Sequence, residues 1–221
     1  MKRDGPRTGG ASFISGVRNV EVRGTHIGLA FSILRYIVNR CAGRSSVISG
    51  RKLLREEIEQ VWNIDRSEVI DNIYRFENGT LVLSPHHFDV PGWPPGEAEK
   101  YTPILLDCFD RGGWFHGAFD RAALVGVVVL DSKRIGQHKD QLQLKFLHVS
   151  NSYRNRGLGT QLFELAKATA RERGAKRLYI SATASENTVN FYLRLGCTVA
   201  AEPDPDLFKL EPEDIHLECD V

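Results

Sequence analysis

The stretch that most constrains the fold of this chain is a strand, a basic glycine-containing turn and a helix in direct succession, at residues 141–174. The turn reads Ser-Asn-Ser-Tyr-Arg-Asn-Arg-Gly-Leu-Gly-Thr over residues 150–160. A helix N-terminus leaves its first N–H groups without intrahelical partners and carries about half a positive charge. Glycines there let the main chain approach an anion closely, and arginines add positive charge. The stretch therefore predicts a phosphate-binding turn at the start of a helix.

The segment after the turn has the pattern of an amphipathic helix. One helical face carries Leu158, Leu162, Leu165, Ala166 and Thr169. Gly174 suits the position just beyond the helix end, and basic residues precede it, where they complement the helix dipole. We therefore expect a helix that covers one face of a sheet.

The strand before the turn changes its alternation part of the way along. Leu142, Leu144 and Phe146 alternate with polar residues, but Leu147 and Val149 are apolar too. A one-residue slip turns all later side chains to the other face unless a β-bulge inserts an extra residue. We therefore predict a bulge near Phe146–Leu147. The alternative is a strand that is buried on both faces.

The turn fits neither of two other phosphate-binding patterns. A Rossmann turn needs a third glycine where Leu162 stands, and a Walker loop needs Gly-Lys-Ser/Thr, which is absent. What remains is Arg-x-x-Gly-x-Gly at Arg154–Gly159. A second motif follows in the run Ile-Ser-Ala-Thr-Ala-Ser-Glu-Asn-Thr-Val-Asn-Phe-Tyr-Leu-Arg-Leu-Gly-Cys. With both motifs, the chain from about Phe115 to its C-terminus resembles the GNAT superfamily of N-acetyltransferases.

This resemblance implies an α/β (α+β) fold with a mixed, mostly antiparallel central sheet. Two parallel strands of that sheet would splay apart, and helices would cover both faces. It also implies acetyl-CoA as co-substrate, with its pyrophosphate on main-chain N–H groups of the turn, and no metal. The implied cofactor-binding residues are Leu147, His148, Val149, Arg154, Asn155, Arg156, Gly157, Leu158, Gly159, Thr160 and Asn187.

The implied reaction is direct attack by a primary amine, of a small molecule or a peptide, on acetyl-CoA in a ternary complex. Tyr192 stands at the family's position for the acid that protonates the leaving thiolate. The alternative for Tyr192 is a tyrosine packed in a helix face. An alternative for the whole chain is a CoA-binding sensor or interaction module without catalysis.

The general base stays unassigned. Histone-acetylating members of the family have a glutamate at the position of Gln143, and an amide cannot act as a base. His116, His148 and Asp89 are possible substitutes, although His148 is also explained as a strand residue that contributes only its main chain.

Composition limits the other classes of function. The chain has 221 residues, a net charge of +1, 42% hydrophobic and 26% charged residues. These values favour one domain plus an extension and give no argument for nucleic-acid or membrane binding. Four scattered cysteines without a CxxC pair indicate reduced thiols in a cytoplasmic protein and no metal site. We expect a monomer or a homodimer.

Residues 1–50 differ from the rest, because lysine and arginine far outnumber acidic residues there. We interpret them as a basic N-terminal extension, poorly ordered or loosely docked, before a GNAT domain at residues 51–221. A transit peptide is the alternative. Within the extension, residues 27–41 have the composition of a short helix.

Other elements follow from local patterns. We expect one or two helices over 52–76, then an Asn-Gly turn followed by a short strand or hairpin arm over 80–83, and a loop over 86–96. A helix between Gly96 and Gly112 comes next. Later strands are expected at 114–120, 123–131, 177–183, 197–202 and 215–221, with a helix from Ser185 to Gly196.

The loop between the last two strands is acidic. It and its edges carry Glu202, Asp204, Asp206, Glu211, Glu213 and Asp214 against the single Lys209. In the family's layout this loop borders the acceptor entrance, where carboxylates would concentrate a cationic amine. The hypothesis is therefore a small polycationic amine or a basic peptide terminus as acceptor. The alternative is a solvated loop that its prolines stiffen.

Overall fold

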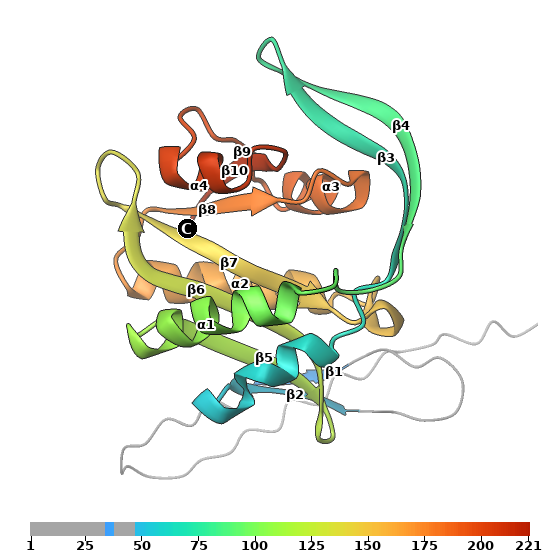
Figure 1. Ribbon diagram of the computed structural model, residues 1–221. Coiled ribbons are helices and arrows are strands. Elements are labelled where there is room, and N and C mark those ends of the chain that lie inside the picture. Colours follow the sequence, from blue (N-terminus) through green and yellow to red (C-terminus); the bar gives the residue numbers. More distant parts are fainter. Residues whose placement is uncertain (1–33, 38–46) are drawn as a thin grey trace, which may run out of the picture. The chain divides into compact units, whose positions relative to one another are not determined.

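The computed structural model describes residues 34–37 and 47–221 (Figure 1). These residues form a sheet in the order β1-β2-β5-β6-β7-β8-β10-β9 and a separate hairpin, β3–β4. The strands are β1 (Leu34–Ile37), β2 (Val47–Lys52), β3 (Glu68–Glu77), β4 (Thr80–Val90), β5 (Trp114–Asp120), β6 (Ala123–Ile135), β7 (Gln141–Val149), β8 (Arg177–Ala182), β9 (Thr198–Val199) and β10 (Ile215–Asp220). The helices are η1 (Arg55–Asn63), α1 (Glu97–Asp110), η2 (Asn151–Tyr153), α2 (Leu158–Glu172), α3 (Glu186–Arg194) and α4 (Pro205–Leu210).

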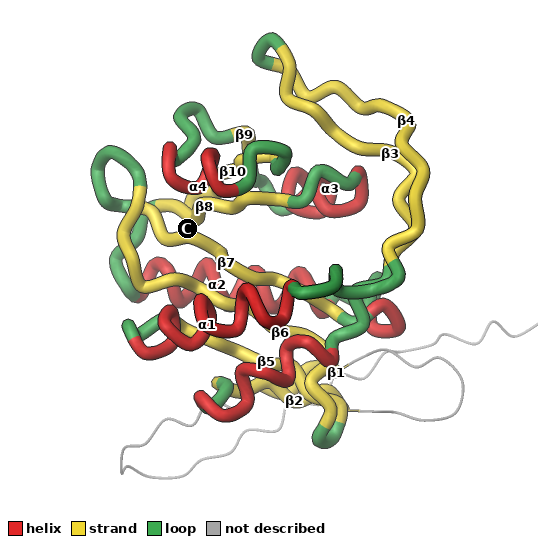
Figure 2. Tube along the Cα trace, viewed as in Figure 1, coloured by secondary structure: helices red, strands yellow, loops and turns green. Residues whose placement is uncertain are grey.

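The sheet has helices on both faces (Figure 2) and a hydrophobic core beneath the helices of each face. On one face, Leu162 and Phe163 of α2 and Val189 of α3 pack against the strands. On the other face, η1 and α1 contribute Ile58 and Leu105 to a second core. Helices therefore cover both faces, as predicted. None of the helices in the described ranges is long and apolar enough to cross a membrane.

The segment after Lys52 departs most from the sequence prediction, which was helical up to residue 76. Only η1 is helical, and Glu68–Glu77 forms β3. The isoleucine, valine and aromatic residues of this segment fit the repeat of a helix as well as that of a strand. Their preference for strands prevails when a partner strand is present. That partner is β4, which also includes His86–Val90, predicted as loop.

One strand lies within residues 1–50, the segment interpreted as an N-terminal extension, and a second strand begins there. β2 pairs with β5, and β1 pairs with β2 at the edge of the sheet. The short helix predicted over 27–41 is wrong at Leu34–Ile37, which are extended. The rest of that predicted helix lies outside the described residues.

The predicted β-bulge is confirmed, one residue earlier than expected. Val129 of β6 pairs with Phe146 of β7, whereas Leu130 pairs with Leu144, so Lys145 is the extra residue. Leu144 accordingly joins the core beneath α2, and Phe146 joins the core beneath α1. The bulge thus reverses the faces of β7, as the slipped alternation requires.

The only parallel pair among the described strands, β7 and β8, is short. Its pairing runs from Gln141–Arg177 to Gln143–Tyr179 and stops there. From Leu144 onward, β7 pairs with β6 on one side but not with β8 on the other. We call the residues of this part from the bulge to the strand end, Lys145–Val149, the open segment. Its unpaired edge can offer main-chain N–H and C=O groups to a ligand.

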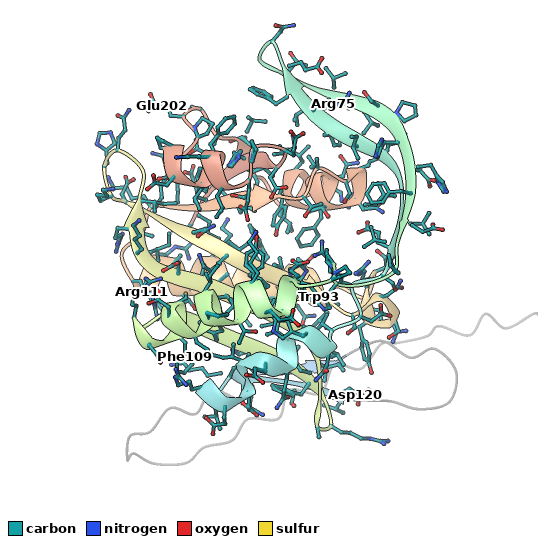
Figure 3. The ribbon with its side chains drawn as sticks, viewed as in Figure 1. Arg75, Trp93, Phe109, Arg111, Asp120 and Glu202 are labelled. Atoms are coloured by element: carbon teal, nitrogen blue, oxygen red, sulfur yellow. The ribbon has the colours of Figure 1, made fainter. Side chains whose placement is uncertain are left out.

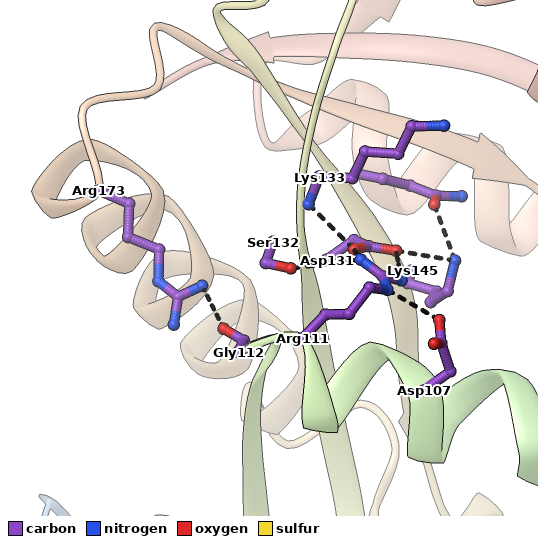
Figure 4. Close-up of polar contacts among 9 residues, drawn as sticks. Asp107, Arg111, Gly112, Asp131, Ser132, Lys133, Lys145 and Arg173 are labelled. Carbon is purple, nitrogen blue, oxygen red and sulfur yellow. Dashed lines mark hydrogen bonds and ion pairs between the residues drawn. The ribbon is translucent and has the colours of Figure 1, made fainter.

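A buried carboxylate holds the bulge from the neighbouring strand (Figure 4). Asp131 of β6 is 5% exposed and lies 3.0 Å from Nη1 of Arg111 and 3.2 Å from Nζ of Lys145. Lys145 also donates to Oε1 of Gln143 at 3.1 Å. Burial alone would raise the pKa of Asp131, but hydrogen bonds from Arg111 and the Lys133 N–H hold it at about 2.

This network generates a stability prediction. Asp131→Asn should destabilise the fold by about 3 kcal/mol, because it leaves Lys145 buried without its counter-charge. The folded pKa of about 2 lies below the ordinary value of 3.8. The carboxylate's contribution is therefore present above pH 4 and lost as pH falls towards 2.

Urea unfolding of both proteins at pH 7 and at pH 3 measures this effect. The matched control is Asp107→Asn, an exposed partner of Arg111, which should cost less than about 1 kcal/mol. Equal stabilities of the Asp131 variant and the parent at pH 7 would contradict the prediction.

Candidate functional site

The basic turn forms as the sequence predicts and leaves the start of α2 without a side-chain cap. Gly157 is the N-cap residue with φ 80°, and Asn155 also has a positive φ, 58°. A glycine cap offers no oxygen to the first helical N–H groups, which belong to Leu158, Gly159 and Thr160. These donors and the helix dipole suit an anion.

The two arginines of the turn have different surroundings. Arg154 donates from Nε to the Val149 carbonyl at 2.9 Å and from Nη1 to the Ser67 carbonyl at 3.0 Å. It therefore fixes the turn to the end of β7 and to the segment before β3. Arg156 is exposed, with its guanidinium 5.7 Å from the Tyr153 ring centroid. Arg156 donates no hydrogen bond to any described residue, so its guanidinium can meet an anion.

Three of the sequence-predicted elements meet at Gly159. A Cβ at this position would lie 3.3 Å from Phe191 of α3 and 3.9 Å from Val149 of the open segment. The start of α2, the end of β7 and α3 are thus brought together. Leu158 is 2% exposed in the core, so only its main chain can contact a ligand.

Tyr192 lies on the buried side of α3. Its ring centroid is 5.8 Å from that of Phe163 and 5.1 Å from that of Phe191, and the residue is 6% exposed. No described residue forms a hydrogen bond with its hydroxyl. Burial, with a smaller effect of Cys197, raises the pKa of Tyr192, so the phenol stays protonated at neutral pH.

The first strand of the hairpin, β3, is the part of the site that the sequence prediction missed, because the segment was predicted to be helical. β3 crosses the start of α3 and bonds to three of its side chains, so that the hairpin curves alongside α3 (Figure 1). The bonds are Asn72 to Glu186 at 2.8 Å, Tyr74 to Asn190 at 3.0 Å, and Asn187 to Glu68 at 3.0 Å. Asn187, predicted to bind the cofactor, is thus engaged with the hairpin.

The three candidates for the base have different environments. Burial, then the charges of Arg66 and Arg154, lowers the pKa of His148 to about 3. Burial lowers that of His116 to about 4, and its Nε2 is buried without a partner among the described residues. Both imidazoles are neutral at pH 7 but weakly basic. Asp89 lies exposed on the outer hairpin strand β4.

The acidic segment is partly helical, which corrects its prediction as a loop. Asp204 caps α4 by accepting from the N–H groups of Asp206 and Leu207, and Glu202 is bonded to Gln137. Figure 3 shows Glu202 on the side where β7 begins and Trp93 on the side where β7 ends. Asp204 and Glu202 therefore have structural partners, whereas Asp206 and Glu213 are exposed.

Comparison with known proteins identifies the class. Residues 77–197 match the model of the acetyltransferase (GNAT) family. The chain therefore belongs to the GNAT acetyltransferases. A search of curated proteins gave no match.

Solved structures share the fold. The structure of nourseothricin acetyltransferase is 21% identical, with a TM-score of 0.58, over 78% of this chain and 98% of that one. PaiA N-acetyltransferase from Thermoplasma acidophilum, in complex with coenzyme A, is 17% identical, with a TM-score of 0.53, over 79% and 99%. An acetyltransferase from Bacillus anthracis str. Ames, in complex with acetyl coenzyme A, is 16% identical, with a TM-score of 0.53, over 79% and 99%. The fold predicted from the sequence is confirmed.

Proposed function

We propose that this protein transfers an acetyl group from acetyl-CoA to a primary amine in a ternary complex. The observation that carries the proposal is the juxtaposition of an uncapped α2 N-terminus with the open segment of β7. The free N–H groups at the α2 N-terminus suit a pyrophosphate. The unpaired main chain of the open segment suits the amide groups of pantetheine. Coenzyme A and acetyl coenzyme A in two structures of the same fold support this assignment.

The proposal gives each predicted residue a task. The main-chain N–H groups from Gly157 to Thr160 would bind the pyrophosphate, with Arg156 adding charge. Main-chain groups of Leu147, His148 and Val149 would pair with pantetheine and stabilise the oxyanion. Arg154 acts indirectly here, because its side chain holds Val149 and Ser67.

The chemistry requires an unprotonated amine. An amine with a pKa near 10.4 is neutral in only about one molecule in 2,500 at pH 7, so the site must accept a proton. The thiolate that leaves needs a proton in return. Tyr192 keeps its proton at neutral pH, which is the form that an acid requires.

A thiol-release assay with acetyl-CoA and a panel of amines tests the proposed function, together with calorimetry of acetyl-CoA and CoA binding. Amine-dependent thiol release is the expected result. Tight binding without release from any amine would favour the non-catalytic CoA-binding module.

The turn provides the first prediction on binding. Gly157→Val should weaken acetyl-CoA binding at least tenfold, about 1.4 kcal/mol. A β-branched residue is strained at φ 80°, so the main chain would move away from the pyrophosphate. Calorimetry on the folded variant measures the change.

Gly112→Val is the matched control, because Gly112 has a similar φ of 86° and open space around it but lies after α1. It should leave acetyl-CoA affinity unchanged. Parent-like affinity in Gly157→Val would remove the turn from the binding site.

Tyr192→Phe provides the prediction on catalysis. The variant keeps the ring packing against Phe163 but loses the proton, so kcat should fall at least tenfold while acetyl-CoA affinity barely changes. Steady-state kinetics and calorimetry together separate the two effects. Parent-like kcat would assign Tyr192 to packing alone.

A further inference from the structure

Five aromatic side chains gather on the face of the open segment that is opposite α2. Trp93 lies beside the N-terminal end of α1 (Figure 3), with its ring centroid 4.8 Å from that of His148 and 4.9 Å from that of Trp62. Phe146 lies 5.2 Å from His148 and 6.2 Å from Tyr101. We call Trp62, Trp93, Tyr101, Phe146 and His148 the aromatic cluster.

The cluster is rigid and partly open. Trp93 donates its indole N–H to the Ile64 carbonyl, and Trp62 donates to the Thr102 hydroxyl, both at 2.8 Å. These bonds fix the planes of both rings. Trp62, Trp93 and Tyr101 remain partly exposed, so their apolar surface is available beside the strand on which the acetyl group would lie.

Asp214 lies on the same face of the sheet, beyond the splayed strands. Ile215 pairs with Ala182 at the end of β8 and points into the core beneath α2. Asp214 is the residue just before β10, and the charge of Arg66, whose guanidinium lies over Trp93, acts on its carboxylate. Asp214 is therefore on the side of the aromatic cluster. Ser181 lies on that face too, and its Oγ is buried without a partner among the described residues.

Arg66 connects the two sides. Its guanidinium lies 5.0 Å from the Trp93 ring centroid, and its charge acts on both His148 and Asp214. The Asp214 carboxylate is half-buried, and no described residue donates a hydrogen bond to it. A ligand between Trp93 and Asp214 would thus meet apolar rings at one end and a carboxylate at the other.

The carboxylate is suited to proton transfer. Burial and the nearby Glu211 raise the pKa of Asp214 to about 6, against the charge of Arg66. His216, its neighbour on β10, is neutral, because burial lowers its pKa and its two ring nitrogens bond to Tyr179 and to the Glu211 carbonyl. Asp214 is therefore ionised at pH 7 yet more basic than an ordinary aspartate.

We infer that the acceptor is a monoamine carried on an apolar body, bound with its body on the aromatic cluster and its nitrogen towards Asp214, which accepts the proton. This inference rests on the proposed function and names its acceptor and its base. Ser181 would supply a hydroxyl to the same ligand, which would satisfy its unpartnered oxygen.

The transfer balances with these groups. The bound ammonium first gives one proton to Asp214, which frees the nitrogen lone pair. The lone pair bonds to the thioester carbonyl carbon, the carbon–sulfur bond breaks, and the nitrogen gives its second proton to water. The thiolate takes a proton from Tyr192. The products are an amide and free CoA, and solvent then exchanges protons with the two side chains.

Local charge disfavours a polycationic acceptor at this place. Arg66 is paired with Glu97 at 3.2 Å, and Lys100 lies 4.9 Å from the Tyr101 ring centroid. Positive charge already lies over the aromatic faces, and the nearby Glu97 carboxylate is paired with Arg66, whereas no described residue donates a hydrogen bond to the Asp214 carboxylate. One ammonium group can be matched there, whereas a second would lie beside Arg66 and Lys100.

The first experiment compares acceptors at fixed acetyl-CoA. The panel is 2-phenylethylamine and hexylamine as apolar monoamines, spermidine as a polycation and glucosamine as a hydrophilic monoamine. We expect kcat/KM at least tenfold higher for the apolar monoamines. A preference for spermidine or glucosamine overturns the inference but leaves the proposed function intact, whereas no thiol release with any amine overturns both.

The second experiment tests the two sides of the site separately. Trp93→Ala and Tyr101→Ala should each raise the KM for the best apolar amine at least fivefold without changing acetyl-CoA affinity. Phe76→Ala, an exposed aromatic of the hairpin, is the control and should change neither. If KM for the apolar amine is unchanged in both cluster variants, the cluster is not the acceptor site.

The third experiment tests the base. In the parent, the slope of log kcat/KM against pH should decrease near pH 6, where half of Asp214 is ionised. Asp214→Asn should lower kcat at least tenfold and abolish that inflection, and Asp214→Glu should restore part of both. Asp220→Asn, at the exposed far end of β10, should keep the parent profile. A parent-like profile in Asp214→Asn excludes Asp214 as the base.

Discussion

The extra residue in β7 is the constraint on which the candidate site depends. Lys145 reverses the faces of the strand, so that Leu144 supports the core beneath α2 while Phe146 and His148 face the other way. Pairing with β8 ends just before it, at Gln143. One inserted residue therefore both opens an unpaired edge of main chain and turns aromatic side chains towards the acceptor side.

Such a bulge has to be held in place, because an unpaired residue leaves polar groups without their regular partners. Asp131 does this with charges rather than with apolar packing. Buried ion pairs seldom add much net stability, since desolvation offsets their attraction, but they disfavour alternative registers. A slip of β7 by one residue would carry Lys145 away from Asp131, so the network stabilises this register over its neighbours.

The sequence predicted those parts of the site that depend on local pattern. The turn and α2 follow from glycine, arginine and helical spacing, and the bulge follows from a slipped alternation that needs no partner to be recognised. β3 was missed because Val69, Ile70 and Ile73 fit a helix until β4 pairs with them. Asp214 was grouped with the other acids, because only the three-dimensional structure brings it within reach of the charge of Arg66, whereas Asp206 is exposed.

One short segment, Ile64–Glu68, ties the two halves of the site together. Asp65 donates its main-chain N–H to the Ser150 hydroxyl oxygen at 3.1 Å. The Ser67 carbonyl accepts from Arg154 of the turn, and the guanidinium of Arg66 lies over the Trp93 ring. Glu68 then reaches Asn187 of α3. A shift at the pyrophosphate turn would therefore move groups that line the proposed acceptor side. This connection suits direct transfer, since both substrates must be positioned by the same rigid frame when the nitrogen attacks.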